Sequence, residues 1–95
     1  MYKYLKDIEF GSNSKEYKLI LARIGKNIRL HRIEMNYSLT DLSVMTDIST
    51  SYLSRVENGK AIKPTIYTYL LICTALEMNP NELFKGLKSD LFDDN

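Results

Sequence analysis

Side chains that commonly carry catalysis or bind metals are sparse in this chain and are not grouped. The single histidine, His31, lies among basic residues and has no serine, cysteine or metal ligand close to it in the sequence. The single cysteine, Cys73, lies in an apolar run, and the acids Asp90, Asp93 and Asp94 lack the ligand spacing of a calcium loop. No Gly-rich phosphate loop or nucleophile motif is present. We therefore expect no enzyme, no catalytic residue, no metal and no cofactor, and a His31 that is solvated or faces a phosphate.

Length and composition limit the class of protein. The 95 residues are 44% apolar, with 13 basic and 12 acidic side chains, which suits one domain with a modest core. A single cysteine forms no intramolecular disulfide, and no apolar run approaches the roughly 18–20 residues that span a bilayer. We expect a reduced, cytoplasmic protein with no membrane segment.

The basic side chains are concentrated in the middle of the chain. Residues 18–63 hold eight Lys or Arg against four acids, a net charge of +4, whereas the whole chain has a net charge of +1. A polyanion responds to this local field rather than to the total charge. The middle segment is therefore a candidate surface for a polyanion, and the alternative is an ordinary solvated helix face.

The spacing of apolar and capping residues predicts five helices and no strand pair. The helices cover about residues 16–35, 39–46, 50–58, 66–77 and 80–86. The residues expected to cap or stop them are Ser38, Ser49, Gly59, Thr65 and Asn79. The expected organisation is an N-terminal extension over residues 1–15, a helical domain over 16–86 and a loose acidic tail over 87–95.

Two of these helices have the spacing of a helix-turn-helix. The segments 39–46 and 50–58 are joined by the three residues 47–49. In such a pair the second helix enters the major groove of DNA and the first crosses the DNA backbone. The spacing alone is a weak signal, and the residues that follow it strengthen the interpretation.

The string over residues 54–59 (Ser-Arg-Val-Glu-Asn-Gly) resembles the one that ends the recognition helix in the lambda-repressor/Cro-like (XRE) helix-turn-helix family. The resemblance extends over about residues 22–84, from residues 24–29 (Ile-Gly-Lys-Asn-Ile-Arg) to residues 79–84 (Asn-Pro-Asn-Glu-Leu-Phe). It implies an all-α fold, a compact five-helix lambda-repressor-like DNA-binding domain. It also implies that the chain is a DNA-binding transcriptional regulator.

The resemblance assigns DNA contacts to individual residues. Those that match base-facing positions are Thr50, Ser51, Ser54 and Arg55. Arg55 would fork onto guanine or hold a phosphate, whereas the hydroxyl groups would read bases loosely. The residues expected at the sugar-phosphate backbone are Lys26, Ser38, Ser49, Tyr52, Asn58 and Lys60.

The resemblance also implies a structural ion pair and reveals three departures from the family pattern. Arg32 and Glu57 match a pair that the family often buries between its first and third helices. Leu39 replaces a Gln that contacts a phosphate, Thr50 replaces an Arg, and Asp47 replaces the usual turn glycine. The first two departures weaken the expected DNA contacts and leave the fold unaffected.

The helix over residues 66–77 is apolar on nearly all sides. The face expected in the core contains Ile66, Tyr69, Leu70, Cys73 and Leu76. A second face, expected to contact another copy of the chain or a partner, contains Tyr67, Leu71, Leu83 and Phe84. The alternative is that the N-terminal segment folds back over this face through Tyr4, Leu5, Ile8 and Phe10.

Together these features predict a sequence-specific regulator of transcription that binds double-stranded DNA. We expect a homodimer on two half-sites about 34 Å apart, and repression by promoter occlusion as the simplest mechanism. A chain of this kind also occurs as an antitoxin, in which case a toxin would be its protein partner. The alternative is a protein-interaction module of antitoxin or anti-repressor type that keeps the fold with weakened DNA binding. Leu39 and Thr50 favour this alternative, whereas Arg55, Asn58 and Lys60 favour DNA binding.

Overall fold

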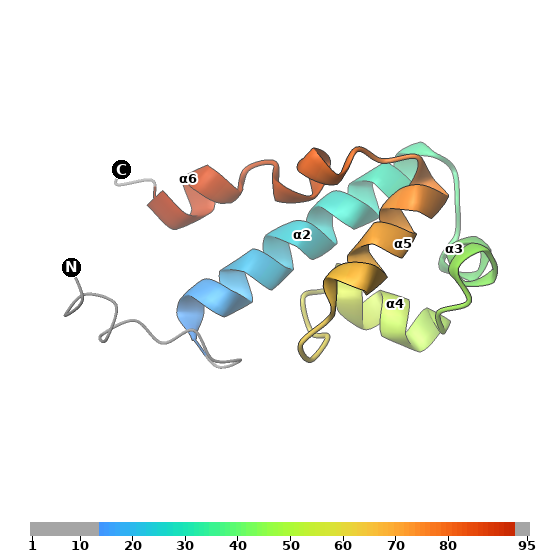
Figure 1. The fold of residues 1–95 in the computed structure, drawn as a ribbon, viewed down its shortest axis with the longest axis horizontal. Coiled ribbons are helices and arrows are strands. Elements are labelled where there is room, and N and C mark those ends of the chain that lie inside the picture. The colour runs from blue at the N-terminus through green and yellow to red at the C-terminus, as the bar shows by residue number, and fades with distance from the viewer. Residues whose placement is uncertain (1–13, 93–95) are drawn as a thin grey trace.

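The longest helix, α2, runs through the whole molecule, and the other helices are arranged around it (Figure 1). The computed structural model describes residues 14–92. Within these residues the elements are α2 (Lys15–Glu34), α3 (Leu39–Thr46), α4 (Thr50–Glu57), α5 (Ile66–Leu76), the 3₁₀ helix η1 (Pro80–Phe84) and α6 (Leu87–Phe92). The helix α4 lies on one side of α2, while η1 and α6 follow its opposite side. The predicted all-α fold is confirmed.

The elements α3, α4, α5 and η1 begin at the caps that the sequence predicts. The Ser38 hydroxyl accepts from the Asp41 amide and the Asp41 carboxylate accepts from the Ser38 amide, which completes a capping box. The hydroxyl groups of Ser49 and Thr65 and the side-chain carbonyl of Asn79 accept in the same way at α4, α5 and η1. Local sequence therefore sets the helix starts.

The core lies between α2, α3, α4 and α5, each of which contributes buried apolar side chains. Leu21, Ile24 and Ile28 of α2 are buried there, whereas Ile20 is half-buried. The largest fully buried side chains are Ile28, Leu42, Leu53, Val56, Ile72 and Leu76. This shared core fixes the positions of α3 and α4 relative to α2.

The buried face of α5 differs in part from the expected one. Tyr69, Cys73 and Leu76 are buried as expected, and burial raises the pKa of the Cys73 thiol. Ile66 and Leu70 were expected beside them and are exposed instead, since α5 turns a different apolar stripe toward the core. Because this helix is apolar at almost every position, its sequence has no hydrophobic periodicity that would identify the buried stripe. None of the described helices, α5 included, is long and apolar enough to cross a membrane.

The expectation of a loose C-terminal tail is wrong for residues 87–92, which form α6. The Arg23 guanidinium donates to both carboxylate oxygens of Asp90, at 2.6 and 2.9 Å, and thereby lowers the pKa of Asp90. Asn27 on the next turn donates to the carbonyl oxygens of Leu83 and Lys85. These contacts hold the C-terminal segment against α2. Residues 93–95 and most of the expected N-terminal extension lie outside the described residues.

Candidate nucleic-acid interface

The helices α3 and α4 and the turn between them form a helix-turn-helix. Asp47 ends α3 with φ 59°, in the left-handed region that favours glycine and that Asp tolerates better than most residues. The Ser43 hydroxyl donates to the carbonyl oxygen of Ile48 and closes the turn. Asp47 therefore adopts the left-handed backbone conformation expected of a residue that replaces the turn glycine.

A nearly buried ion pair holds the C-terminal end of α4 against α2. Arg32 Nε lies 2.7 Å from Oε2 of Glu57, and Arg32 Nη2 lies 3.0 Å from Oε1. Their side chains are 12% and 4% exposed. The hydrogen bonds with Glu57 raise the pKa of Arg32, whose Nη1 also donates to the carbonyl oxygen of Tyr37. This is the ion pair expected from the sequence, and it fixes the orientation of α4.

A glycine that sequence reasoning did not single out allows α2 and α4 to touch. A Cβ atom on Gly25 would lie 2.6 Å from the carbonyl oxygen of Glu57 and would also meet that of Val56. Because both obstacles are backbone atoms, a larger residue would push the two helices apart. The sequence did contain an indication of this contact, because a glycine in the middle of a helix normally costs stability and so points to a close approach.

The helix α4 buries one side and leaves a polar side open. Leu53, Val56 and Glu57 face the core, whereas Thr50, Ser51 and Arg55 are exposed. Ser54 is half-buried, and its carbonyl oxygen accepts from the Asn58 side chain at 2.8 Å. The structure thus brings three of the four expected base-reading residues onto one open surface and leaves Ser54 partly covered.

Arg55 packs over the ring of Tyr52, with its guanidinium carbon 5.5 Å from the ring centre. Tyr52 itself is half-buried against the core. A cation over an aromatic face is held by the ring quadrupole and loses part of its rotational freedom. The sequence assigned both residues to the DNA surface but did not foresee the contact between them.

The other expected backbone contacts fall into two groups. Ser38, Ser49, Asn58 and Lys60 are exposed. The hydroxyl oxygens of Ser38 and Ser49 already accept backbone N–H groups, and their O–H groups remain available as donors. Lys26 is not brought together with these residues, since it lies in a shallow groove with Arg23 and Asp90, toward α6.

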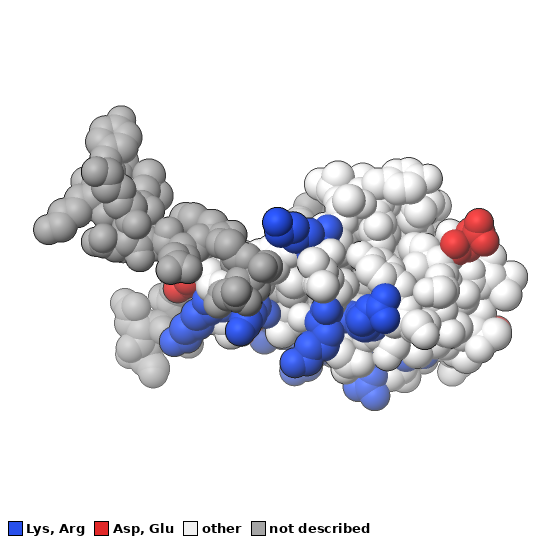
Figure 2. Space-filling model, turned by 90° about the horizontal axis from the view of Figure 1, so that it is seen from below, with Lys and Arg blue, Asp and Glu red and all other residues white. Residues whose placement is uncertain are grey.

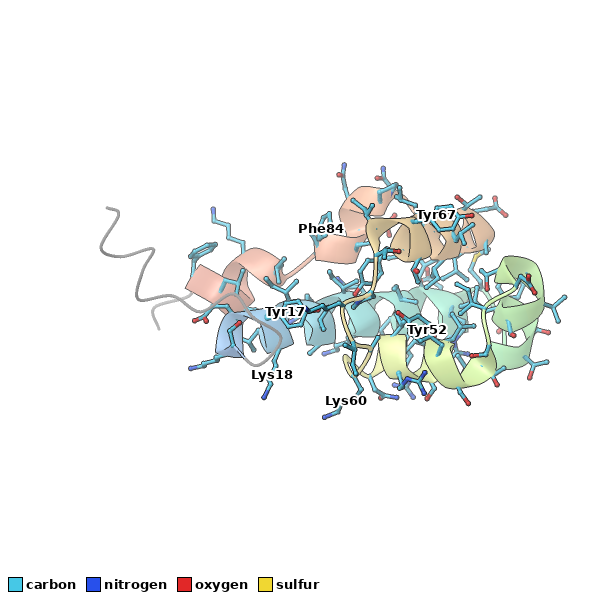
Figure 3. All side chains as sticks on the ribbon, turned by 60° about the horizontal axis from the view of Figure 1, so that its bottom comes forward. Tyr17, Lys18, Tyr52, Lys60, Tyr67 and Phe84 are labelled. Carbon is cyan, nitrogen blue, oxygen red and sulfur yellow. The ribbon has the colours of Figure 1, made fainter. Side chains whose placement is uncertain are left out.

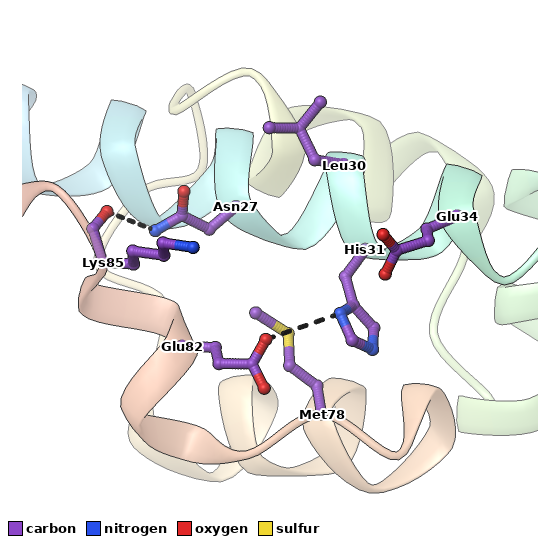
Figure 4. Close-up of a pocket in the computed structure, with 7 residues that line it drawn as sticks. All are labelled: Asn27, Leu30, His31, Glu34, Met78, Glu82 and Lys85. Atoms are coloured by element: carbon purple, nitrogen blue, oxygen red, sulfur yellow. Dashed lines mark hydrogen bonds and ion pairs between the residues drawn. The ribbon is translucent and has the colours of Figure 1, made fainter.

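His31 is neither solvated nor directed at the open side of α4, so that expectation is wrong. Its Nε2 atom lies 3.1 Å from the carbonyl oxygen of Leu76, and its Nδ1 atom lies 3.8 Å from Oε2 of Glu82. The ring lines a small pocket of about 170 Å³ between α2 and η1 (Figure 4). It faces this side because the end of α5 and the middle of η1 lie over that turn of α2. His31 therefore belongs to the packing of η1 and not to the helix-turn-helix.

The expected partner face is present in part. Tyr67 and Phe84 are 69% and 50% exposed, and Leu71 is half-buried. Leu83 was expected on this face and is instead buried in the core, because it anchors η1 against α2. Tyr67 and Phe84 lie on the side away from Lys18 and Lys60 (Figure 3). The N-terminal residues expected as an alternative cover lie outside the described residues.

The face that carries α4 is basic. Figure 2 views the molecule from this side and shows Lys and Arg side chains gathered across it, with the visible acidic side chains at its margins. Exposed residues that contribute positive charge to the described part of the chain include Lys15, Lys18, Arg29, Arg55, Lys60 and Lys63. A polyanion meets an attractive field on approaching α4.

A family model described as Helix-turn-helix matches residues 28–83, which contain α3, α4 and the turn between them. The chain belongs to the helix-turn-helix family. Its membership of the XRE type, predicted from residues 54–59, is confirmed. The match ends at the buried Leu83 and leaves out α6 and the first half of α2.

Known members of the helix-turn-helix family resemble the chain in sequence and fold. It is 38% identical to the HTH-type transcriptional regulator SlrR of Bacillus subtilis (strain 168) over 61 residues. These residues make up 64% of this chain and 40% of SlrR. The chain thus spans less than half of that relative.

Two solved structures of restriction-modification controller proteins share the fold. C.AhdI from Aeromonas hydrophila has a TM-score of 0.63 and 30% identity, covering 67% of this chain and 96% of C.AhdI. A point mutant of C.Esp1396I has a TM-score of 0.65 and 21% identity, covering 80% of this chain and 95% of the other. At 21% identity, the similarity to C.Esp1396I concerns the fold alone.

Proposed function

We propose that the chain binds double-stranded DNA in a sequence-specific manner and regulates transcription, with α4 in the major groove. The observation that carries this proposal is the open polar surface of α4, on which Thr50, Ser51 and Arg55 stand together in a basic face. The major groove admits one α-helix, whose exposed side chains then reach base edges. The names of SlrR as a transcriptional regulator and of C.AhdI as a controller protein support this proposal.

The exposed side chains on the side of α4 have distinct roles in this proposal. The guanidinium group of Arg55 donates two hydrogen bonds to guanine, and the hydroxyl groups of Thr50 and Ser51 contribute weaker discrimination. Ser38 and Ser49 donate to phosphates at the starts of α3 and α4, and Lys60 provides a charge. Lys26 has no role here because it lies toward α6.

The test is fluorescence anisotropy with a pool of random duplex DNA, titrated at several salt concentrations, followed by selection of the preferred sequence. The parent protein should bind the pool with an affinity that falls steeply with salt. An Arg55→Ala variant should lose most of the preference for the selected sequence over the pool. No binding at low salt would overturn the proposal and would favour a protein-interaction module.

We further infer repression by promoter occlusion, because a domain of this size can compete with RNA polymerase without any further contact. In transcription assays with purified polymerase, the selected site should reduce transcription when it overlaps the promoter. The same site placed well upstream is the control and should have no effect. Activation from the upstream position would contradict occlusion.

We also propose that the chain acts as a homodimer on two half-sites. Tyr67 and Phe84 are largely exposed, and large exposed aromatic side chains on one face are typical of an interaction surface. Because this face lies away from α4, a two-fold contact there would leave the α4 helix of each copy uncovered. A different protein on this face, such as a toxin, is the alternative occupant.

A further inference from the structure

The N-terminal half of α2 carries lysines outside the segment that matches the family. The match begins at residue 28, whereas α2 begins at Lys15. Lys15 and Lys18 lie on its first turns and are exposed. Among the described residues neither lysine takes part in an ion pair, in contrast to Arg23 on the same helix. Within residues 14–92 both ammonium groups are therefore available to a ligand from solution.

A close backbone contact places Lys18 next to the end of α4. Gly59 has φ +70°, and a Cβ atom there would lie 2.8 Å from the Cα of Ala22. Lys18 lies one helical turn before Ala22, and Lys60 directly follows Gly59. The contact between Gly59 and Ala22 therefore brings the two lysines to neighbouring positions, although they are far apart in the sequence.

The two lysines flank an open groove between α2 and the loop that follows α4. The groove has a volume of about 490 Å³, and Lys18, Ala22, Asn58 and Lys60 are among its lining residues. None of the described residues that line it is acidic. Lys18 and Lys60 project to the side of the molecule that carries α4 (Figure 3). The groove thus continues the basic face without an interruption by negative charge.

We infer that Lys18, with Lys15 one turn earlier, binds backbone phosphates of duplex DNA outside the base pairs that α4 reads. The inference rests on the proposed DNA binding and adds a second anchoring segment to it. Most of the groove is lined by apolar residues, and its two lysines and the Asn58 amide are the groups that suit a phosphate, because each lysine neutralises one charge and releases a counterion. Contacts of this kind set the affinity and orientation of the protein and contribute no sequence discrimination.

The test compares salt dependence between matched variants on a long duplex that contains the selected sequence. Lys18→Ala should make the slope of log K against log salt shallower by about 0.9. The ratio of parent to variant affinity should accordingly fall roughly threefold between 50 and 200 mM salt, since that is the effect of one phosphate contact. The preference for the selected sequence over random duplex should stay unchanged, and Lys18→Arg should retain the parent slope.

The control variant is Lys88→Ala, which removes the same charge from α6 on the other side of α2. It should keep the parent slope, and circular dichroism should show that all variants are folded. A duplex trimmed to the base pairs that α4 reads should abolish the difference between parent and Lys18→Ala.

Three outcomes would overturn the inference. Binding of DNA by Lys18→Ala with the parent slope on the long duplex would refute it and leave the proposed function standing. A difference that persists on the trimmed duplex would place the phosphate contact inside the site that α4 reads. Absence of DNA binding by the parent would instead refute the proposed function and this inference together.

Discussion

Arg55 and Tyr52 form a contact that bears on how α4 could read a base. The guanidinium carbon lies 5.5 Å from the ring centre, and the two residues are three positions apart on α4. Holding the guanidinium group before binding lowers the entropy lost when it forms two hydrogen bonds to guanine. A lysine in its place keeps the charge but has no planar fork.

The first prediction separates charge from geometry at this residue. Arg55→Lys should lose about 1–3 kcal/mol of discrimination between the selected sequence and random duplex, which is the worth of one bidentate contact. The salt dependence should remain that of the parent because the charge is kept. Competition anisotropy measures both quantities. An unchanged preference would show that Arg55 holds a phosphate rather than a base.

The second prediction concerns the ion pair of Arg32 with Glu57. Glu57→Ala leaves the guanidinium group of Arg32 with one carbonyl partner at a site where its side chain is 12% exposed. The free energy of unfolding should fall by about 3–5 kcal/mol, the usual cost of removing one partner of a buried pair. Urea denaturation measures this loss.

A double variant tests whether the cost comes from the unpaired charge. Replacing both partners by apolar residues, Arg32→Met with Glu57→Leu, should recover much of the stability. A Glu57→Ala variant that loses less than about 1 kcal/mol would mean that water already screens the pair.

At the scale of the elements, the sequence predicts whatever depends on neighbouring residues. Helix starts follow from pairs such as Ser38 with Asp41, and these were confirmed. The buried stripe of α5 was not predictable in full, because nearly every position of that helix is apolar. The docking of α6 was not predictable either, since Arg23 and Asp90 are 67 positions apart and nothing local relates them.

The third prediction tests the close approach of α2 and α4. Gly25→Ala would normally stabilise a helix, because alanine loses less backbone entropy than glycine on folding. Here the added Cβ would meet the carbonyl oxygens of Val56 and Glu57, so we expect a loss of about 1–3 kcal/mol in the free energy of unfolding. Lys26→Ala, an exposed neighbour on the same helix, is the control. A gain in stability for Gly25→Ala would contradict the predicted clash.

The fourth prediction concerns the docking of α6 at low pH. Arg23, and to a lesser extent Lys26, lower the pKa of Asp90 from its ordinary value of 3.8. A carboxyl group with a lowered pKa stabilises the folded arrangement above its ordinary pKa, and this stabilisation is lost as the pH falls through the lower folded value. The amides of α6 should therefore lose hydrogen-exchange protection below about pH 4.

Asp90→Asn provides the control for this pH dependence. The variant has no titrating group at that position, so the protection of α6 should be low at neutral pH and should change little on acidification. Full protection in the parent at a pH low enough to protonate Asp90 would mean that the half-buried Leu87 and Leu91 hold α6 without the ion pair.

At the scale of the whole molecule, the chain separates two surfaces. The basic surface carries Lys18, Arg55 and Lys60 on the side of α4, and the apolar surface carries Tyr67 and Phe84 on the side away from it (Figure 3). The concentration of basic side chains in residues 18–63 predicted the basic surface in outline. The groove between Lys18 and Lys60 could not be predicted, because it depends on the packing of Gly59 against Ala22.

The fifth prediction decides what occupies the apolar surface. If two copies meet there, Tyr67→Lys should convert a dimer into a monomer in sedimentation analysis, because two buried lysines would face each other across a two-fold axis. Val44→Lys, a matched change at an exposed residue of α3, should leave the molar mass unchanged. The monomeric variant should also bind a single half-site as the parent does and lose the advantage of two half-sites about 34 Å apart. A parent that is already monomeric would refute the dimer and leave this surface to another protein.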